Sequence, residues 1–344
     1  MIEGHGNDIY KYQGKIAGDF SSNIVYCGMH KDLEAFLSKQ VKRAGNYPDP
    51  HALELKEKIA AFHHIKSTQV LVTNGSAEAF YLIAHSMQGK KSAIALPSFA
   101  EYEDACKLYK HDITYQSIHT IDKNISVDTD AFWLGIPNNP DGKITDTNTL
   151  NHLLATYAQT RFVVDRAYEA LCPACKPLTS LHEKYFNLIS VHSLTKTFAI
   201  PGLRIGYIVA APDIIENIQQ LCIPWSVNTL AIAAGCYTLD NYARLQPDVE
   251  KIHAESSAFQ KQISAIKGLK VYPSDCNYFL VQIINGATAS VLKQYLIEKH
   301  GLLIRDASNF RGLDNTYFRL ALQNKELNHQ LITALNKWAT TIHG

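Results

Sequence analysis

Short apolar runs alternate with amphipathic segments along most of the chain. Residues 70–73, 92–96 and 161–164 are nearly continuous apolar runs, which are typical of strands buried on both faces of a sheet. Further runs of this kind are residues 131–134, 187–191 and 205–210. Because the segments between them suit crossover helices, this order predicts an α/β fold with a mainly parallel central sheet flanked by helices.

The pattern changes after Pro224, where longer helical segments are separated by short strands. These strands are predicted at residues 269–271, 278–282, 302–304 and 317–320. A chain of 344 residues is longer than the ~100–200 residues typical of one domain, so we expect a large and a smaller α/β domain. We predict an N-terminal arm and start of the small domain over 1–40, the large domain over 41–225 and the small C-terminal domain over 226–344.

Composition narrows the choice of partners. The formal net charge is +1, so there is no basic surface that would suggest nucleic acid. No run of ~18 apolar residues suggests a membrane span, and the first residues lack the basic and apolar regions of an export signal. Seven cysteines, an odd number, fit reduced thiols. We therefore expect a cytoplasmic protein that acts on a small molecule.

Cys172 and Cys175 form a CxxC pair. Such a pair is half of a zinc site or a redox pair. No second pair lies at zinc-finger spacing, and no His-x-His pattern adjoins it. We therefore expect no metal, although a metal-binding module at this pair stays open as an alternative.

The segment Ser193–Arg204 carries the strongest chemical signal, because it sets Lys196 among hydroxyl groups and places Arg204 eight positions later. A lysine that condenses with an aldehyde needs a lowered pKa, which nearby positive charge or burial provides. The pattern favours a pyridoxal phosphate site in which Arg204 binds the phosphate. A single lysine and arginine are more often surface residues, so the other strand ends must decide.

Residues that directly follow the predicted strands fit the same cofactor, since ligands of α/β sheets bind beyond the carboxyl ends of the strands. Ser76 and Ala77 open a helix after a strand, where free N–H groups favour a phosphate. Asp165 follows another strand, where its carboxylate could keep a pyridine nitrogen protonated. Ordinary helix caps are the alternative for all three.

Two more strand ends add groups for a flat ring. Asn139 lies in a turn, and Asn139 and Tyr168 could hydrogen-bond a phenolic oxygen. Phe99, two residues beyond Pro97, could stack on the ring. Turn chemistry and ordinary core packing explain these residues equally well when each is taken alone.

Together, the segments 74–78, 138–142, 164–168 and 193–207 resemble the fold-type I pyridoxal phosphate enzymes, and specifically the class I and II aminotransferases. The resemblance implies that Lys196 condenses with the cofactor aldehyde. It also implies a role for Asp165 at the ring nitrogen, and for Asn139 and Tyr168 at the phenolic oxygen. It further implies that the phosphate is held by Ser76, Ala77, Ser193 and Arg204. Phe99 stacks on the ring, and Tyr47 reaches the cofactor of a second subunit, which implies a homodimer.

Within that superfamily, four stretches are most similar to the threonine-phosphate decarboxylases, which are relatives of the histidinol-phosphate aminotransferases. The four are residues 97–103, 199–204, 224–228 and 303–313. The resemblance implies four substrate-binding residues, namely His5, Asn23, Arg305 and Arg319. Two arginines suit a substrate that carries both a carboxylate and a phosphate, since each guanidinium offers a planar fork to an anion. Two surface arginines in ion pairs are the alternative.

The implied reaction is decarboxylation of L-threonine O-3-phosphate to (R)-1-amino-2-propanol O-2-phosphate in cobalamin biosynthesis. The bond at the substrate α-carbon that stands perpendicular to the ring decides the outcome, and the sequence does not give that angle. Transamination, as in a histidinol-phosphate aminotransferase, is therefore the alternative. A non-catalytic protein that senses the cofactor is a third possibility, against which the lysine and the complete set of ring residues argue.

Two positions depart from the family pattern. The segment 24–28 departs from the pattern, since relatives usually carry a proline after the Asn-Ile pair, so the loop that enters the substrate site is expected to differ. Arg166 follows Asp165 where the pattern commonly has an acidic residue. We expect Arg166 to add positive charge near the ring without removing the role of Asp165.

Overall fold

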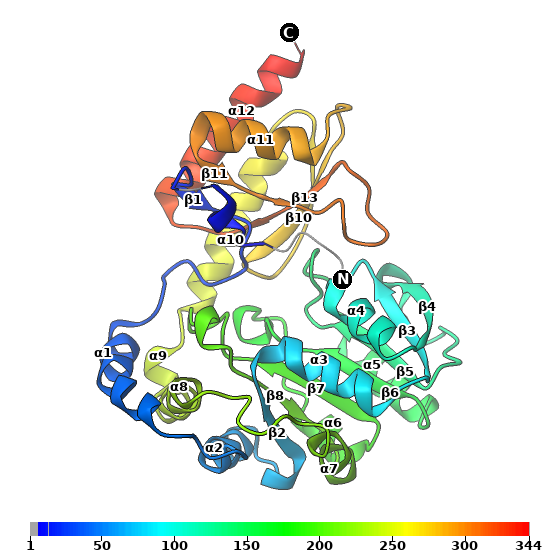
Figure 1. Cartoon of the computed structure of the whole chain (residues 1–344). Coiled ribbons are helices and arrows are strands. Elements are labelled where there is room, and N and C mark those ends of the chain that lie inside the picture. The colour runs from blue at the N-terminus through cyan, green and yellow to red at the C-terminus, as the bar shows by residue number, and fades with distance from the viewer. Residues whose placement is uncertain (1–5, 13, 344) are drawn as a thin grey trace.

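The computed structural model describes residues 6–12 and 14–343. It consists of a large body around one sheet and a smaller body beside it, which Figure 1 shows below and above. The large sheet has the strand order β2-β8-β7-β6-β5-β3-β4. Its strands are β2 (Val70–Thr73), β3 (Lys91–Leu96), β4 (Asp112–Ser117), β5 (Ala131–Gly135), β6 (Arg161–Asp165), β7 (Leu188–Ser193) and β8 (Gly206–Val209).

The neighbouring strands β4, β3, β5, β6 and β7 pair in parallel, while β8 pairs antiparallel with both β7 and β2. The predicted mainly parallel α/β sheet is therefore confirmed. β6, β7 and β8 are nearly all buried, which explains why their sequences read as continuous apolar runs. β4 was not predicted, because it is an edge strand with mostly exposed, polar positions.

Helices cover both faces of this sheet. They are α1 (Lys31–Gln40), α2 (Leu53–His63), α3 (Gly75–Ser86), α4 (Ala100–Leu108), α5 (Thr147–Thr156), α6 (Thr179–Lys184), α7 (Pro212–Gln219) and α8 (Thr229–Asp240). Side chains of α3, α4 and α7 pack with alternate residues of the strands in one cluster, and those of α5 and α6 pack in another. The sheet is therefore the middle layer of three, which fixes the position of its carboxyl ends.

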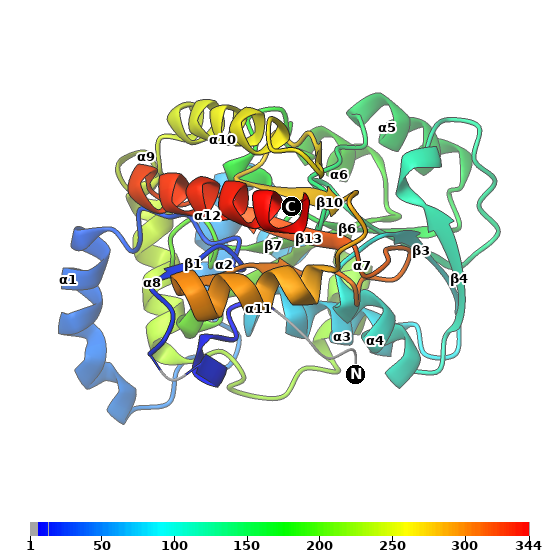
Figure 2. The ribbon, with the colours of Figure 1, turned by 90° about the horizontal axis from the view of Figure 1, so that it is seen from above.

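The smaller body is built on the antiparallel sheet β12-β13-β10-β9. Its strands are β9 (Leu269–Tyr272), β10 (Tyr278–Ile283), β12 (Arg305–Asp306) and β13 (Tyr317–Ala321). The short α9 (Tyr242–Leu245) precedes α10 (Val249–Ser264), α11 (Ala289–His300) and α12 (Lys325–His343). Seen from above, α10, α12 and α11 lie alongside one another over this sheet (Figure 2).

The N-terminal segment joins the smaller body through β1 (Gly18–Asp19), which pairs in parallel with β11 (Leu302–Leu303). The predicted strand 302–304 is present as β11, which ends one residue earlier at Leu303. The chain changes sheets at Ile304, because β11 pairs with β1 whereas β12 pairs with β13.

The domain limits predicted after residues 40 and 225 stay predictions. The packing does place Leu33 of α1 and Ala231 of α8 in one cluster with β2 of the large sheet. Between the two bodies, both Arg311 Nε and Nη2 donate to the Glu103 carboxylate at 2.7 Å. No helix in the part of the chain that the structure describes is both long and apolar enough to cross a bilayer.

Candidate active site

A cavity of about 280 Å³ lies where the carboxyl ends of the large sheet meet the smaller body and the N-terminal segment. It brings together seven of the predicted site residues: Asn23, Phe99, Asn139, Tyr168, Lys196, Arg305 and Arg319. His5 lies outside the described residues, whereas its neighbours Gly6 and Asn7 line the cavity. Three distant parts of the chain therefore meet around Lys196.

Lys196 lies three residues beyond the end of β7, in the turn that leads toward Pro201. Burial and the positive charges of Arg319 and Arg204 lower the pKa of its ammonium group to about 8. A substantial fraction of the amine is therefore neutral near physiological pH, which is the form that attacks an aldehyde. The lowered pKa expected from the sequence is present, with a second arginine among its causes.

Asp165 is the last residue of β6, and its side chain is almost fully buried. One oxygen, Oδ2, accepts a 2.6 Å hydrogen bond from the Tyr102 hydroxyl, and the other accepts one of 2.8 Å from the Ala167 N–H. Burial raises the pKa of Asp165, against which these two hydrogen bonds act. Tyr102 was not predicted as a site residue, although it lies in the stretch 97–103 that carried part of the resemblance.

Phe99 precedes α4, and its ring meets that of Tyr102 edge to face at 6.0 Å. The ring of Tyr168 meets that of Tyr278 in the same way at 4.8 Å. Tyr278 in turn donates a 2.8 Å hydrogen bond to the Asn138 carbonyl. Aromatic contacts thus hold Phe99 and Tyr168 on two sides of the cavity, where each can meet a flat ring.

Of the expected phosphate residues, Ser76 and Ala77 lie at the N-terminus of α3, Ser193 ends β7 and Arg204 follows Leu203. None of the four lines the 280 Å³ cavity. Gly75 has φ of +79°, and a Cβ there would lie 2.4 Å from Arg204 Nη2. Gly206 leaves room for the N–H of Ser76, since a Cβ at Gly206 would lie 2.7 Å from that nitrogen. Arg204 is thus held against the first turn of α3, beside free N–H groups that favour a phosphate.

Ser193 ends β7, and its hydroxyl lies 2.8 Å from the Thr195 hydroxyl. Arg204 donates to the Pro201 carbonyl at 3.1 Å, and its own φ is +58°. The segment 193–204 therefore folds back so that its two ends flank Lys196. This is the local reason that the sequence motif makes one site.

Arg305 and Arg319 are directly opposite each other on the antiparallel strands β12 and β13. Both are more than nine-tenths buried. Burial and the charge of Arg319 lower the pKa of Arg305 to about 10. No carboxylate of the described residues lies within ion-pair distance of either guanidinium. Like charges placed opposite each other are unfavourable, so the pair indicates an anion site.

The partners of these arginines are uncharged oxygens. Arg305 donates to Asn309 Oδ1 at 2.8 Å, and Arg319 donates to Asn139 and, at 2.6 Å, to the Ser21 carbonyl. Arg319 Nε is buried without a hydrogen-bond partner. Asn309 and Ser21 were not predicted, and only the position of Asn309 inside the stretch 303–313 pointed to it.

The side chain of Asn23 is buried, and neither its amide nitrogen nor its oxygen has a hydrogen-bond partner. The backbone carbonyl of Asn23 accepts a hydrogen bond of 3.2 Å from the Asn277 side chain, which connects the N-terminal segment to the smaller body. Buried amides are normally satisfied, so this one is available to a ligand. Ile24, at the start of the segment that departs from the family pattern, also lines the cavity.

Tyr47 lies away from the cavity with 84% of its surface exposed, and its ring is 5.2 Å from that of Trp225. Arg166 also does not line the cavity. Its guanidinium forms a 2.8 Å ion pair with Glu169, so the positive charge expected near the ring is balanced. In the described residues no group of three His, Cys, Asp or Glu side chains could hold a metal ion.

The residues present fit pyridoxal phosphate. The α3 N-terminus with Arg204 suits its phosphate, the buried Asp165 suits its ring nitrogen, and Lys196 suits its aldehyde. The orphaned amide of Asn23 and Nε of Arg319 show that the cavity also has unused donors for a second, polar ligand. Site and fold together define a pyridoxal phosphate enzyme.

The chain belongs to the family Aminotransferase class I and II, whose family model matches residues 18–335. Pyridoxal phosphate is the cofactor of this family. The resemblance recognised in the sequence is therefore confirmed.

Three comparisons are more specific. The chain is 34% identical to a putative threonine-phosphate decarboxylase of Caldanaerobacter subterraneus, covering 96% of this chain and 92% of that protein. It is 28% identical to the adenosylcobalamin biosynthesis bifunctional protein CobDQ of Leptospira interrogans, over 92% of this chain and 38% of that longer protein. The crystal structure of L-threonine-O-3-phosphate decarboxylase from Porphyromonas gingivalis matches with a TM-score of 0.90 at 35% identity, covering 93% of this chain and 99% of that one.

Proposed function

We propose that this protein decarboxylates L-threonine O-3-phosphate to (R)-1-amino-2-propanol O-2-phosphate in cobalamin biosynthesis. The observation that carries the proposal is the pair Arg305 and Arg319, which face each other in the cavity of Lys196 without a carboxylate partner. Threonine phosphate has both a carboxylate and a phosphate, so it offers each guanidinium one anion. Histidinol phosphate carries only the phosphate, which leaves one of the two charges uncompensated.

The relatives support the proposal. Two similar proteins are named for threonine-phosphate decarboxylation, and one is named for adenosylcobalamin biosynthesis. The similarity to both decarboxylases extends over more than nine-tenths of this chain. It therefore includes both bodies and the cavity between them.

We assign the cofactor contacts as follows. Lys196 binds the aldehyde carbon, and Asp165 holds the ring nitrogen. Asn139 and Tyr168 hold the phenolic oxygen, and Phe99 stacks on the ring. The phosphate is held by Ser76, Ala77, Ser193 and Arg204. When bound, pyridoxal phosphate supplies an electron sink for the pair of electrons that carbon dioxide leaves behind on the substrate α-carbon.

The chain's own contribution to the reaction is orientation. Arg305 and Arg319 hold the two anionic groups of the substrate from one side, with Asn23 and His5 as further donors. Two fixed anions determine how the substrate α-carbon is turned, and this selects the carboxylate bond for cleavage. Because its pKa is about 8, Lys196 is in part an ammonium group near neutral pH, and in this form it can deliver a proton to the α-carbon afterwards.

We also propose that the enzyme is a homodimer located in the cytoplasm. Tyr47 is 84% exposed and lies beside Trp225, which is 51% exposed. An exposed aromatic pair outside the cavity suits contact with a second copy of the chain, whose cofactor phosphate Tyr47 would reach. Sedimentation equilibrium of the purified holoenzyme tests the dimer.

The decisive experiment incubates the holoenzyme with L-threonine O-3-phosphate, without a keto acid, and follows release of carbon dioxide. We expect release from the wild type and from the control Lys267→Ala, whose lysine is exposed, and a loss of at least about 1,000-fold in Lys196→Ala. No release from the wild type, together with amino transfer between histidinol phosphate and 2-oxoglutarate, would replace the proposal by the aminotransferase alternative.

A further inference from the structure

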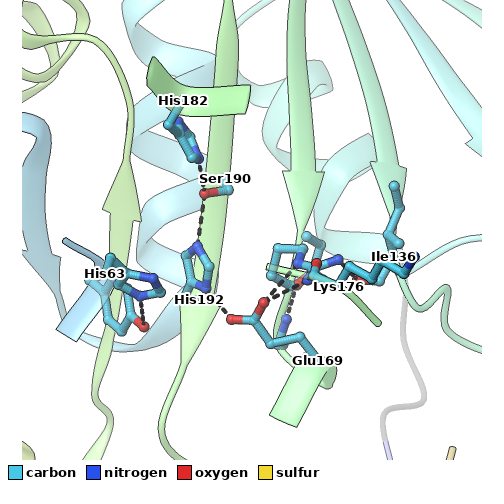
Figure 3. Close-up of polar contacts among 11 residues, drawn as sticks. His63, Ile136, Glu169, Lys176, His182, Ser190 and His192 are labelled. Carbon is cyan, nitrogen blue, oxygen red and sulfur yellow. Dashed lines mark hydrogen bonds and ion pairs between the residues drawn. The ribbon is translucent and has the colours of Figure 1, made fainter. Parts of the chain in front are cut away.

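A second polar cluster lies outside the catalytic cavity and contains no residue assigned to the cofactor or substrate. Figure 3 shows its chain of contacts from His182 through Ser190 and His192 to Glu169. The two Ser190 contacts are 2.8 Å each, and His192 Nδ1 lies 2.5 Å from Glu169 Oε1. Glu169 is the one carboxylate in this chain of contacts.

Glu169 also binds Arg166. Arg166 Nε and Nη2 lie 2.9 Å and 2.8 Å from Glu169 Oε2, so the carboxylate receives a forked contact. Burial raises the pKa of Glu169, but the charges of His192 and Arg166 outweigh it and hold that pKa well below its usual range. Glu169 therefore stays ionised throughout the neutral pH range.

Arg166 extends the contacts to two further segments. Its Nη1 donates to the Ile136 carbonyl at 3.1 Å, and its Nη2 donates to the Lys176 carbonyl at 2.7 Å. Ile136 lies three residues before Asn139, in the turn that lines the catalytic cavity. Arg166 itself is 3% exposed and follows Asp165 directly.

His192 connects the same carboxylate to β7. It precedes Ser193 and lies four residues before Lys196. Its ring stacks on that of Tyr207 at 4.8 Å, which fixes its orientation. One negative charge thus joins the three segments that carry Asp165 and Tyr168, Asn139, and Ser193 with Lys196.

We propose that Glu169 is a positioning residue for the cofactor, which holds these three segments in register from behind through Arg166 and His192. The proposal rests on the cofactor contacts assigned under the proposed function. It does not depend on the identity of the substrate. Second-layer groups of this kind set how precisely the residues that touch a cofactor are held.

Neutralising Glu169 leaves the buried guanidinium of Arg166 without its counter-charge beside Asp165. Glu169 is faced by His192, Arg166 and His63, and Lys196 by Arg319, Arg204 and Asp165. An uncompensated positive charge on Arg166, close to Asp165 and Lys196, opposes protonation of the cofactor's ring nitrogen and of the nitrogen of Lys196. The pKa of the cofactor bound to Lys196 should then fall.

The cluster is also open to a direct chemical test. Glu169, Arg166 and His192 line a separate cavity of about 370 Å³, and 24% of the Glu169 side chain is exposed. A small carboxylate such as propionate fits a space of this size. It can therefore replace the missing negative charge when the side chain of Glu169 is shortened.

The experiment compares Glu169→Gln, Glu169→Asp and Glu169→Ala with Glu183→Gln, whose glutamate is exposed on α6. The measurements are the dissociation constant of pyridoxal phosphate and the pH titration of the visible band of the bound cofactor. For Glu169→Gln we expect about tenfold weaker cofactor binding, the value of one charge-assisted hydrogen bond. We also expect a spectroscopic pKa lower by about 0.5 to 1 unit. The Asp variant should recover part of both values.

For Glu169→Ala, propionate should restore cofactor affinity and the spectroscopic pKa, whereas propionamide should not. Equal cofactor affinity and spectroscopic pKa in Glu169→Gln and Glu183→Gln would overturn the proposal. So would equal rescue by the amide, or a loss of thermal stability without a spectroscopic change. All these readouts are taken without substrate. If the wild type released no carbon dioxide from threonine phosphate while the Glu169 variants still showed these effects, the substrate assignment would be refuted. The role of Glu169 would then be supported.

Discussion

Two regions of this molecule bury arginines in opposite ways. In the second polar cluster, outside the catalytic cavity, Arg166 has a carboxylate partner in Glu169 and two carbonyl acceptors. In the catalytic cavity, Arg305 and Arg319 face each other, and among the described residues they hydrogen-bond only to uncharged oxygens. All three are at least nine-tenths buried, so burial alone does not distinguish the regions.

The difference lies in what compensates the charge. Burying an isolated charge is costly unless it is paired, and Arg166 is paired within the chain. Arg305 and Arg319 have no such partner among the described residues, so their burial raises the free energy of the folded chain, and a bound anion would offset this cost. A buried arginine that is paired with a carboxylate therefore indicates a structural role. Two adjacent buried arginines without any carboxylate partner indicate a ligand-binding site.

The largest expected effect concerns Arg166. Arg166→Met should lower the free energy of unfolding by about 3–5 kcal/mol, because it leaves Oε2 of the buried Glu169 carboxylate without its guanidinium partner. Chemical denaturation followed by circular dichroism measures this. The double variant Arg166→Met with Glu169→Leu should recover much of the loss, since it removes both charges. A single variant as stable as the wild type would show that the paired arginine is not structural.

Arg319→Met should act on function instead. We expect kcat/KM for threonine phosphate to fall about 100-fold, the value of one or two charged hydrogen bonds to the substrate. The free energy of unfolding should change by less than about 1.5 kcal/mol, because the lost hydrogen bonds are offset by relief of the repulsion from Arg305. Steady-state kinetics and denaturation on the same preparation check both. A loss of stability as large as that of Arg166→Met would erase the contrast between the two regions.

A smaller effect is expected on how the free energy of unfolding depends on pH. Burial lowers the pKa of His63 to about 4 and that of His182 to about 3, so both are neutral in the folded protein near pH 7. Below pH ~6.5 the unfolded chain binds protons that the folded chain refuses, so stability falls as the pH drops toward 4. Each histidine contributes up to about 1.4 kcal/mol per pH unit.

Denaturation of the wild type and of His63→Gln between pH 7 and pH 4.5 measures this slope. The variant lacks one of the two titrating rings, so its stability should depend less steeply on pH. Equal slopes would mean that His63 is not kept neutral by the fold. Lys196, with its pKa of about 8, titrates above this range, and the difference between the two slopes reports the contribution of His63.

Much of the fold could be predicted from local sequence. Strands such as β6 and β7 are buried on both faces, and continuous apolar runs announce them. The edge strand β4 was missed, because half-exposed polar positions carry no such signal. Candidate site residues at the strand ends could also be predicted, because each motif lies within one turn or one helix start. Ser76 at the start of α3 is an example.

The amino-acid sequence by itself determined the family and the cofactor and predicted Lys196 as the residue that condenses with it, because these depend on motifs whose residues are close along the chain. Only the tertiary structure decided which charged side chains from distant parts of the chain lie next to each other. Arg305 and Arg319 lie opposite each other through the register of β12 with β13. Glu169 became the partner of His192, 23 positions away, through the folding of a turn against β7. The physical reason is that strand pairing and side-chain direction bring distant charges together, and no local period encodes them.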